Sequence, residues 1–392
     1  MKNKLPKHPS KLSLVMLFAL TASLFSFNLP NSATETENDV KASDVKTEKK
    51  AETMPIYGNW KTYTEKDGLP SDKIFCVRVD GDRVWAGTNH GLALLENGKW
   101  KVYTEADGLA HRSVLAIDVS PITGDVWIGT MSGLNRFSGG KFETFTQFNS
   151  GLANDVIYAV TCDEKDIWVA TGGGASVLDT YTGKWAIYTE QNAPMHEPWT
   201  YSICAGGGKI FIAAWGGGVI EWDKSARRFR DYTDPDGEME IDLFPDDGLV
   251  HDITTAVSYS NDILWVATYF GLSRYDGNHW KGYFDHDSGL AGNFINYIKA
   301  DGDVAWICSD NGLSSFNGDT WVTYKNLGND KSGNVIIDGN SENERTIKAS
   351  TSISHNFTIG VDFKDNELWV ATSKGLSHGE VVGQTEIKTS KL

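Results

Sequence analysis

The feature that most constrains this chain is a short motif that recurs along most of its length. Its clearest copy reads WIGTMSGL, from Trp127 to Leu134. Trp127 and Ile128 favour a β-strand, and Gly133 gives the backbone the freedom to reverse before a second strand begins. Six further copies follow the same pattern: WAGTNHGL (85–92), WVATGGGA (168–175), FIAAWGGGV (211–219), WVATYFGL (265–272), WICSDNGL (306–313) and WVATSKGL (369–376).

The spacing of the copies predicts the fold class. The first four copies recur roughly every 42 residues, and each repeat holds four strand-like segments separated by turns. In the second repeat these segments are 114–119, 126–130, 134–137 and 142–146. Four antiparallel strands at this period are typical of a propeller blade. Seven copies therefore predict an all-β protein, a seven-bladed β-propeller of four-stranded antiparallel blades.

The two ends of the array predict how the ring closes. Other repeats carry an aromatic fourth strand, such as WKVYT at 100–104, but none follows the last motif. A strand of this type, WKTYT at 60–64, instead precedes the first motif. We expect this N-terminal strand to complete the last blade, which removes the exposed edges of an open array. The propeller is expected over 56–379, followed by a C-terminal tail at 380–392.

The N-terminal residues are predicted to direct export. Residues 1–33 begin with lysines and continue into an apolar run at 12–27, which is the layout of a secretory signal. Cleavage is expected near Ser32 and Ala33, and an uncleaved membrane anchor is the alternative. Residues 34–55 are charged and almost free of large apolar side chains, which predicts a disordered linker. A periplasmic or secreted location follows from this interpretation.

Charge and cysteine usage restrict the partners. The net charge of −16 argues against nucleic acids and anionic membrane surfaces as partners, because binding there requires the opposite sign. A neutral or cationic ligand fits better. The four cysteines lie in apolar strand patterns without metal-ligand spacing, so we expect buried thiols, with a disulfide between Cys162 and Cys204 as the less favoured alternative. We expect a monomer without a cofactor or a metal.

Five repeats also carry DGL or SGL ahead of their first strand, at 67–69, 107–109, 150–152, 247–249 and 288–290. Together with the Trp-x-Gly/Ala-Thr-x-x-Gly-Leu turn, this pattern resembles the two-component regulator propeller repeat. The resemblance covers roughly residues 56–379. In that family, the repeats build the periplasmic sensor region of bacterial hybrid histidine kinases, which is implicated in detecting oligosaccharides or other small ligands. No kinase or receiver segment follows the repeats here, so we expect signalling only through a protein partner.

The variable residues of the motif turn indicate where a ligand could bind. In a propeller these turns and the DGL loops lie on one face, where they converge. Aromatic residues on the fourth and fifth blades could stack on sugar rings or on peptide side chains, and the alternative is that they only fill the top of the channel. The aromatic candidates are Trp199, Trp215, Tyr269 and Phe270, and the polar candidates in the turns are His90, Asp310 and Asn311.

Three histidines, His111, His251 and His355, occupy equivalent positions ahead of their first strands. Converging imidazoles can bind zinc or copper. Seven-fold geometry, however, places these blades well apart. We therefore favour a second interpretation, in which the residue at this position caps the turn, as Ser71 and Asn154 could. The three histidines remain candidates for ligand contacts.

The function predicted from these features is an exported ligand-sensing or protein-binding module that recognises a carbohydrate, another small ligand or a protein partner. The alternative is a propeller enzyme, similar to streptogramin lyase or active on glycans, that uses His111, His251 and Glu197 on the same face. Two long connections are expected on that face. Residues 234–250 form an acidic loop, and residues 326–356 are either a lid or tolerated length.

Overall fold

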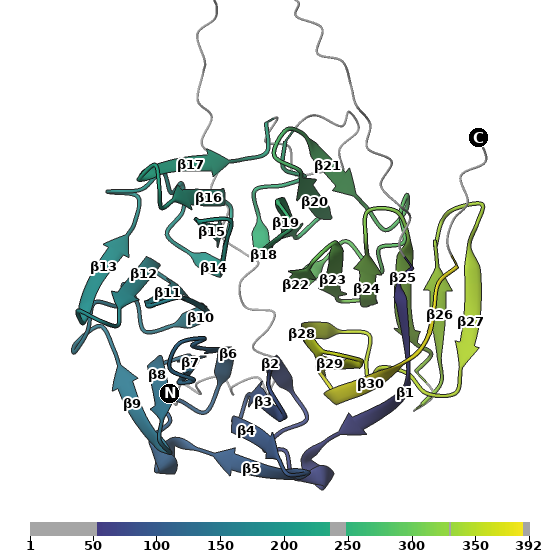
Figure 1. Ribbon diagram of the computed structural model, residues 1–392, viewed down its shortest axis with the longest axis horizontal. Helices are drawn as coiled ribbons and strands as arrows, with labels where there is room; N and C mark the ends of the chain where they lie inside the picture. The colour runs from purple at the N-terminus through teal and green to yellow at the C-terminus, as the bar shows by residue number, and fades with distance from the viewer. Residues whose placement is uncertain (1–52, 236–247, 329–330, 387–392) are drawn as a thin grey trace, which may run out of the picture. The chain divides into compact units, whose positions relative to one another are not determined.

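The computed structural model describes residues 53–235, 248–328 and 331–386, which form seven antiparallel β-sheets around a central channel (Figure 1). The innermost strands of neighbouring sheets contact each other all the way round, so the ring is closed. The predicted seven-bladed propeller is confirmed. The predicted signal segment and nearly all of the predicted linker lie outside the described residues. Within the described residues, no helix combines the length and the apolar character that a membrane crossing requires.

Each blade repeats the same order of strands from the channel outward. The innermost strands are β2 (Ile74–Asp80), β6 (Val114–Val119), β10 (Ile157–Asp163), β14 (Thr200–Gly206), β18 (Thr254–Ser260), β22 (Ile295–Asp301) and β28 (Thr358–Lys364). The second strands are β3 (Arg83–Thr88), β7 (Val126–Thr130), β11 (Asp166–Thr171), β15 (Lys209–Ala214), β19 (Ile263–Thr268), β23 (Val304–Ser309) and β29 (Glu367–Thr372).

The two outer positions follow the same pattern. The third strands are β4 (Gly91–Glu96), β8 (Gly133–Ser138), β12 (Gly174–Asp179), β16 (Gly218–Asp223), β20 (Leu272–Tyr275), β24 (Gly312–Phe316) and β30 (Gly375–Gln384). The fourth strands are β5 (Lys99–Tyr103), β9 (Lys141–Phe145), β13 (Lys184–Tyr188), β17 (Arg228–Tyr232), β21 (Trp280–Tyr283), β25 (Trp321–Asn326) and β1 (Pro55–Tyr63). Two short 3-10 helices, η1 (Glu65–Asp67) and η2 (Glu105–Asp107), open DGL loops.

The N-terminal strand closes the ring as predicted. β1 pairs with β30 in the seventh blade, from Tyr63 opposite Leu376 to Pro55 opposite Gln384. β30 therefore continues past Gly379, the predicted end of the propeller. The expected tail at 380–392 begins later than the sequence indicated, because the first residues of β1 still have backbone groups to pair there.

The scaffold role of the motif residues follows from their packing. Trp127 is 1% exposed and stacks on Phe145 with ring centroids 5.7 Å apart. The loop glycines are needed for a close approach, because a Cβ added to Gly151 would lie 2.1 Å from the Cβ of Trp185. The motif tryptophan and the loop glycine therefore build the contacts between strands and between blades. All four cysteines are free thiols, and burial raises the pKa of Cys76 and Cys204 to about 12.

The 326–356 insertion is a hairpin that widens one blade. Its strands β26 (Gly333–Ile337) and β27 (Arg345–Ala349) continue the sixth sheet beyond β25, which gives that sheet six strands (Figure 1). Val335 and Ile337 are buried. The insertion thus extends the outer edge of the sixth sheet, where the sequence left open a lid or tolerated length. The predicted acidic loop at 234–250 lies mostly outside the described residues.

A network of charges joins the last blades to the first inside the channel. Arg78 lies 3.0 Å from Asp118 and 3.5 Å from Asp362, and Lys299 also binds Asp362. Asp362 is 2% exposed and accepts a hydrogen bond of 2.8 Å from the backbone N–H of Val79. These four side chains occupy the same position on β2, β6, β28 and β22, so they tie four adjacent blades together.

Replacing Asp362 with Ala is expected to destabilise the protein by roughly 3 kcal/mol, because it leaves two partly buried cations without a shared partner. Urea denaturation would measure the loss. Asp82→Ala is the matched control, since Asp82 pairs with Lys364 on the open surface and exposed ion pairs contribute little. Equal, small losses in the two variants would contradict the proposed role of the network.

Candidate functional site

The channel mouth on one face is built by a bulge that recurs in every blade. The pairing between each first and second strand is irregular at the second residue of the first strand. Bulges re-aim side chains and are frequent beside functional sites. The residues at this position are Phe75, Leu115, Tyr158, Tyr201, Thr255, Asn296 and Ile359.

The motif turns lie next to these bulges. In each blade the first turn residue donates its backbone N–H to the residue that precedes the first strand, as in Trp215 to Trp199 at 2.8 Å and Tyr269 to Ile253 at 3.0 Å. The two sets of variable residues inferred from the sequence are therefore adjacent on one face. Their side chains surround the mouth of the channel.

Aromatic side chains from four neighbouring blades form a continuous series of contacts at this mouth. Tyr158 stacks on Tyr201 with ring centroids 4.6 Å apart, and Tyr201 contacts Trp215 at 5.0 Å. Trp215 meets Tyr269 edge to face at 5.6 Å. We call this series the aromatic arc; it consists of Tyr158, Trp199, Tyr201, Trp215, Tyr269, Phe270 and Phe294.

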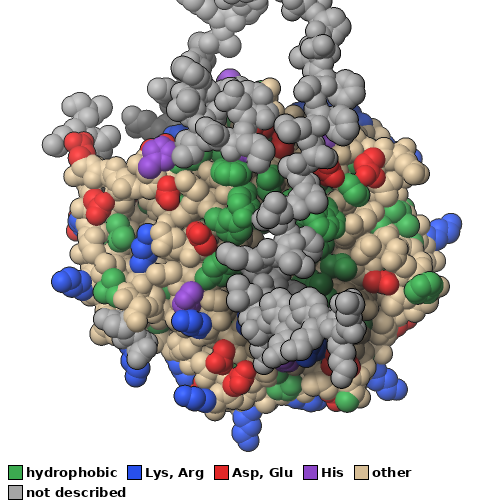
Figure 2. Space-filling model, turned by 180° about the vertical axis from the view of Figure 1, so that it is seen from behind, with side chains coloured by type: hydrophobic (Ala, Val, Ile, Leu, Met, Phe, Trp, Pro, Cys, Tyr) green, Lys and Arg blue, Asp and Glu red, His purple; other side chains and the backbone are tan. Residues whose placement is uncertain are grey.

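The arc continues through Tyr269 to the fifth and sixth blades. Tyr269 lies 5.5 Å from Phe270 and 4.0 Å from Phe294, measured between ring centroids. All members of the arc are partly exposed. On the third blade, Gly172 leaves room for Trp199, because a Cβ there would lie 3.2 Å from the indole Nε1. A space-filling view shows hydrophobic side chains gathered near the centre of one face (Figure 2).

The structure brings together the four aromatic candidates from the sequence and adds three. Tyr158, Tyr201 and Phe294 were not singled out. The first two could have been found by comparing the second residue of every first strand. Phe294 could have been found at the position immediately before the first strand, which Trp199 occupies on the fourth blade.

The polar candidates from the sequence are not members of the aromatic arc. Asp310 lies beside Phe294, because the backbone N–H of Asp310 donates to the backbone oxygen of Phe294 at 3.1 Å. Burial raises the pKa of the Asp310 carboxyl. The side chain of Asn311 donates to the backbone oxygen of Ala291 at 3.0 Å, so it braces its own loop. His90 is exposed on the first blade, outside the blades that carry the arc.

The three equivalent histidines cap turns. The Nδ1 atoms of His111, His251 and His355 accept backbone N–H groups two residues later at 3.0, 2.9 and 3.0 Å. Ser71 and Asn154 make the same contact with side-chain oxygens at 3.1 and 2.9 Å. An accepting Nδ1 requires a neutral ring with its proton on Nε2. No group of three or more metal-ligating side chains occurs among the described residues.

Only one of these histidines reaches the arc. The ring of His251 lies 4.5 Å from that of Phe270, and His251 is 5% exposed. His355 is held by Ser373, whose hydroxyl lies 2.9 Å from its Nδ1. His111 belongs to the second blade. The sequence therefore located the capping position correctly, and the three side chains are distributed around the mouth.

The caps predict a loss of stability in acid. Burial lowers the pKa of His251, against the opposing effect of Asp252, and burial together with Lys374 lowers the pKa of His355. The unfolded chain takes up these protons more readily, so their contribution is complete above about pH 6.5 and is lost as the pH falls through the lowered pKa values. The ring of His251 also contacts Phe270, and the ring of His355 also contacts Ser373.

The melting temperature measured between pH 7.5 and pH 5 tests this expectation. The double variant His251→Asn/His355→Asn should fall less over this range, because Asn154 shows that an amide oxygen makes the same cap without titrating. Each cap is worth about 1 kcal/mol. An identical pH dependence in the variant and the wild type would show that these histidines do not control it.

Comparisons with known proteins find structures with a similar fold but no match by sequence. No family model and no curated protein matches the sequence. The structure is similar to the extracellular domain of a protein designated a hybrid two component system from B. thetaiotaomicron, with 18% identity, a TM-score of 0.62, and coverage of 83% of this chain and 42% of that one. Virginiamycin B lyase from Staphylococcus aureus gives 14% identity, a TM-score of 0.57, and coverage of 83% and 99%.

A second extracellular domain of this type from B. thetaiotaomicron has 14% identity and a TM-score of 0.57, covering 86% of this chain and 44% of that one. The protein thus spans less than half of either B. thetaiotaomicron chain. At these identities the similarity shows the fold alone, and it confirms the fold implied by the propeller-repeat resemblance.

Proposed function

We propose that this protein is an extracytoplasmic ligand-binding propeller that holds a carbohydrate against the aromatic arc and acts through a protein partner. The observation that carries the proposal is the unbroken contact series from Tyr158 to Phe294 at the mouth of the channel. Clustered, partly exposed aromatic rings on a soluble protein mark a binding surface. The two extracellular neighbours in the structural comparison support a location outside the cytoplasm.

The chemistry of the arc favours a neutral ligand. Tyr and Trp present flat apolar faces with polar edges, which match the apolar faces and the hydroxyl rims of sugar rings. The net charge of −16 disfavours anions. Asp310 lies next to Phe294 at the end of the arc, and its carboxylate could accept hydrogen bonds from sugar hydroxyl groups.

A lyase is the second candidate, and the likeness to virginiamycin B lyase over 99% of that chain favours it. The residues proposed for it from the sequence are His111, His251 and Glu197. Among the described residues, no hydrogen bond links any two of these three. Two of them also use Nδ1 to cap turns. Binding therefore remains our principal proposal.

A screen of the purified wild-type protein against immobilised neutral, anionic and amino-substituted oligosaccharides tests the proposal. We expect retention of neutral glycans with little change between low and high salt, because stacking on aromatic rings is not screened by ions. Mass spectrometry of the recovered ligand distinguishes the two candidates, since a lyase would cleave a linear oligosaccharide into two smaller fragments, one of which carries a new double bond. Retention of anionic glycans alone, or no retention of any glycan, would overturn the proposal.

A further inference from the structure

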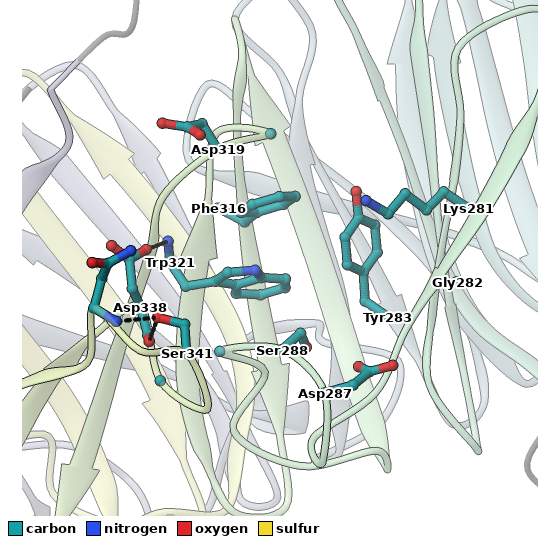
Figure 3. Close-up of a pocket in the computed structure, with 14 residues that line it drawn as sticks. Lys281, Gly282, Tyr283, Asp287, Ser288, Phe316, Asp319, Trp321, Asp338 and Ser341 are labelled. Carbon is teal, nitrogen blue, oxygen red and sulfur yellow. Dashed lines mark hydrogen bonds between the residues drawn. The ribbon is translucent and has the colours of Figure 1, made fainter. Parts of the chain in front are cut away.

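A second cavity lies on the outer part of the ring, between the fifth and sixth blades (Figure 3). Its volume is about 330 Å³. β21, the loop at 287–289, and the turn between β24 and β25 form three of its walls. The fourth wall is the turn at 338–343 between β26 and β27, so the cavity depends on the insertion that makes the sixth sheet wider than the others.

The insertion turn is fixed across both blades. The side-chain amide of Asn340 donates to the backbone oxygens of Asp285 and Ser288 at 2.7 and 2.8 Å. The carboxylate of Asp338, which is 8% exposed, accepts the backbone N–H of Trp321 at 3.1 Å. The wall is thus held by hydrogen bonds to both blades, and the cavity is preformed.

Two aromatic side chains bring hydrogen-bond donors to this cavity. Tyr283 and Trp321 are each 7% exposed, and their rings meet edge to face at 5.7 Å. Trp321 also stacks on Phe316 at 4.2 Å, and Figure 3 shows these two rings on one side and Tyr283 on the other. Within the described residues, no hydrogen bond reaches the Tyr283 hydroxyl or the Trp321 Nε1, although both residues line the cavity.

Of the other five tyrosines at this place in the fourth strands, Tyr232 and Tyr324 have hydroxyl partners, whereas Tyr63, Tyr103 and Tyr188 have none within the described residues. The hydroxyl of Tyr232 donates to Glu221 at 2.7 Å, and that of Tyr324 accepts the backbone N–H of Tyr57 at 3.0 Å. The Tyr283 hydroxyl and the Trp321 Nε1 are not among the fully buried, unpaired polar atoms of the described residues, so both are accessible from the cavity. Burial raises the pKa of Tyr283 to about 12, so its hydroxyl remains a donor at neutral pH. The two donors are therefore available to a ligand in the cavity.

The remaining polar groups define the class of this ligand. The lining carries three carboxylates, Asp287, Asp319 and Asp338, and one cation, Lys281, so an anionic ligand would be repelled. A simple amine could meet the carboxylates but could not accept from Tyr283. Hydroxyl groups both donate and accept. At about 330 Å³ the cavity is at the small end of ligand sites. We propose that it binds a neutral polyhydroxylated ligand the size of one sugar residue.

Ligand-observed NMR titration with the methyl glycosides of glucose, galactose, mannose and xylose tests this proposal. It should be performed on the wild type and on Trp215→Ala/Tyr269→Ala, which lacks the centre of the aromatic arc. At least one glycoside should bind both proteins. Tyr283→Phe removes only the hydroxyl and should weaken this binding by about 3- to 10-fold. Tyr181→Phe, at a residue 71% exposed elsewhere on the ring, should leave it unchanged.

The outcomes separate the two sites. Binding that is unaffected by Tyr283→Phe, that disappears in the arc variant, or that is not detected for any glycoside overturns the cavity proposal. Preferential binding of methylamine over every glycoside also overturns it. Because the cavity and the arc share no residue, the proposed function of the arc can be contradicted while the cavity proposal is supported. An unchanged melting temperature in Tyr283→Phe would show that the lost affinity does not come from unfolding.

Discussion

Deletion of residues 53–64, which removes β1, is expected to abolish cooperative folding of the whole ring. β1 supplies the fourth strand of the seventh blade and covers the edge of β30. It buries Met54, Tyr57 and Trp60 at 0%, 5% and 7% exposure. An open edge would also be available for pairing with other chains, so the truncated protein should aggregate.

The magnitude of this effect follows from the buried side chains. Three large side chains at about 1.5–3 kcal/mol each give roughly 5–9 kcal/mol. The stacking of Tyr63 on Trp369 at 5.6 Å is lost in addition. Such a loss is comparable to the total stability of a typical domain, about 5–15 kcal/mol.

Circular dichroism melting of the truncated protein would measure the effect. Deletion of residues 34–50, from the predicted linker, is the control and should leave the melting temperature unchanged. A truncated protein that lacks 53–64 and still melts cooperatively at the wild-type temperature would refute the closure by β1. The comparison also distinguishes the contribution of the strand from a general effect of shortening the N-terminus.

The fold was predictable because the repeat encodes it many times. Six of the seven copies begin with a tryptophan and the fourth begins with Phe211, and the missing fourth strand after the last copy reveals the closure. The hairpin of β26 and β27 was not predictable in this way. It occurs once, so no period marks it, and its strand residues alternate only over two short segments.

The sites were predictable only in part. Trp199, Trp215, Tyr269 and Phe270 stood out because they interrupt a regular motif. Tyr158, by contrast, lies within an ordinary strand pattern, and only the bulge directs it to the mouth.

The outer cavity could not be predicted because it requires contacts between segments far apart in sequence. The hydrogen bonds from Asn340 to Asp285 and Ser288 cross more than fifty residues. Their existence depends on how the insertion folds back on the fifth blade, and no local pattern encodes that arrangement. That Tyr283 and Trp321 line one cavity is likewise visible only in the folded ring.

Replacing Trp215 and Tyr269 together with Ala is expected to remove oligosaccharide binding at the aromatic arc. The two rings meet at 5.6 Å in the middle of the arc, and each also contacts a further member, Tyr201 or Phe294. Truncation of a central aromatic residue commonly costs about 2 kcal/mol or more. Two such losses, about 4 kcal/mol together, reduce the affinity by roughly 1,000-fold, since each 1.4 kcal/mol is a factor of ten.

The control must remove two aromatic side chains without touching the arc. Phe148 and Tyr181 are 97% and 71% exposed, so Phe148→Ala/Tyr181→Ala leaves the core and the mouth intact. Trp215→Phe/Tyr269→Phe provides a second comparison, because it retains rings at both positions and should keep part of the affinity. All three variants should melt within a few degrees of the wild type.

Isothermal titration of the oligosaccharide retained most strongly by the wild type, performed on the wild type and on Trp215→Ala/Tyr269→Ala, tests the proposed function most directly. We predict saturable binding to the wild-type protein and to the Phe148→Ala/Tyr181→Ala control, and an affinity roughly 1,000-fold lower in the arc variant, in which only the outer cavity can still hold a sugar residue. Wild-type affinity in a correctly folded arc variant would contradict the assignment of the channel mouth as the ligand site.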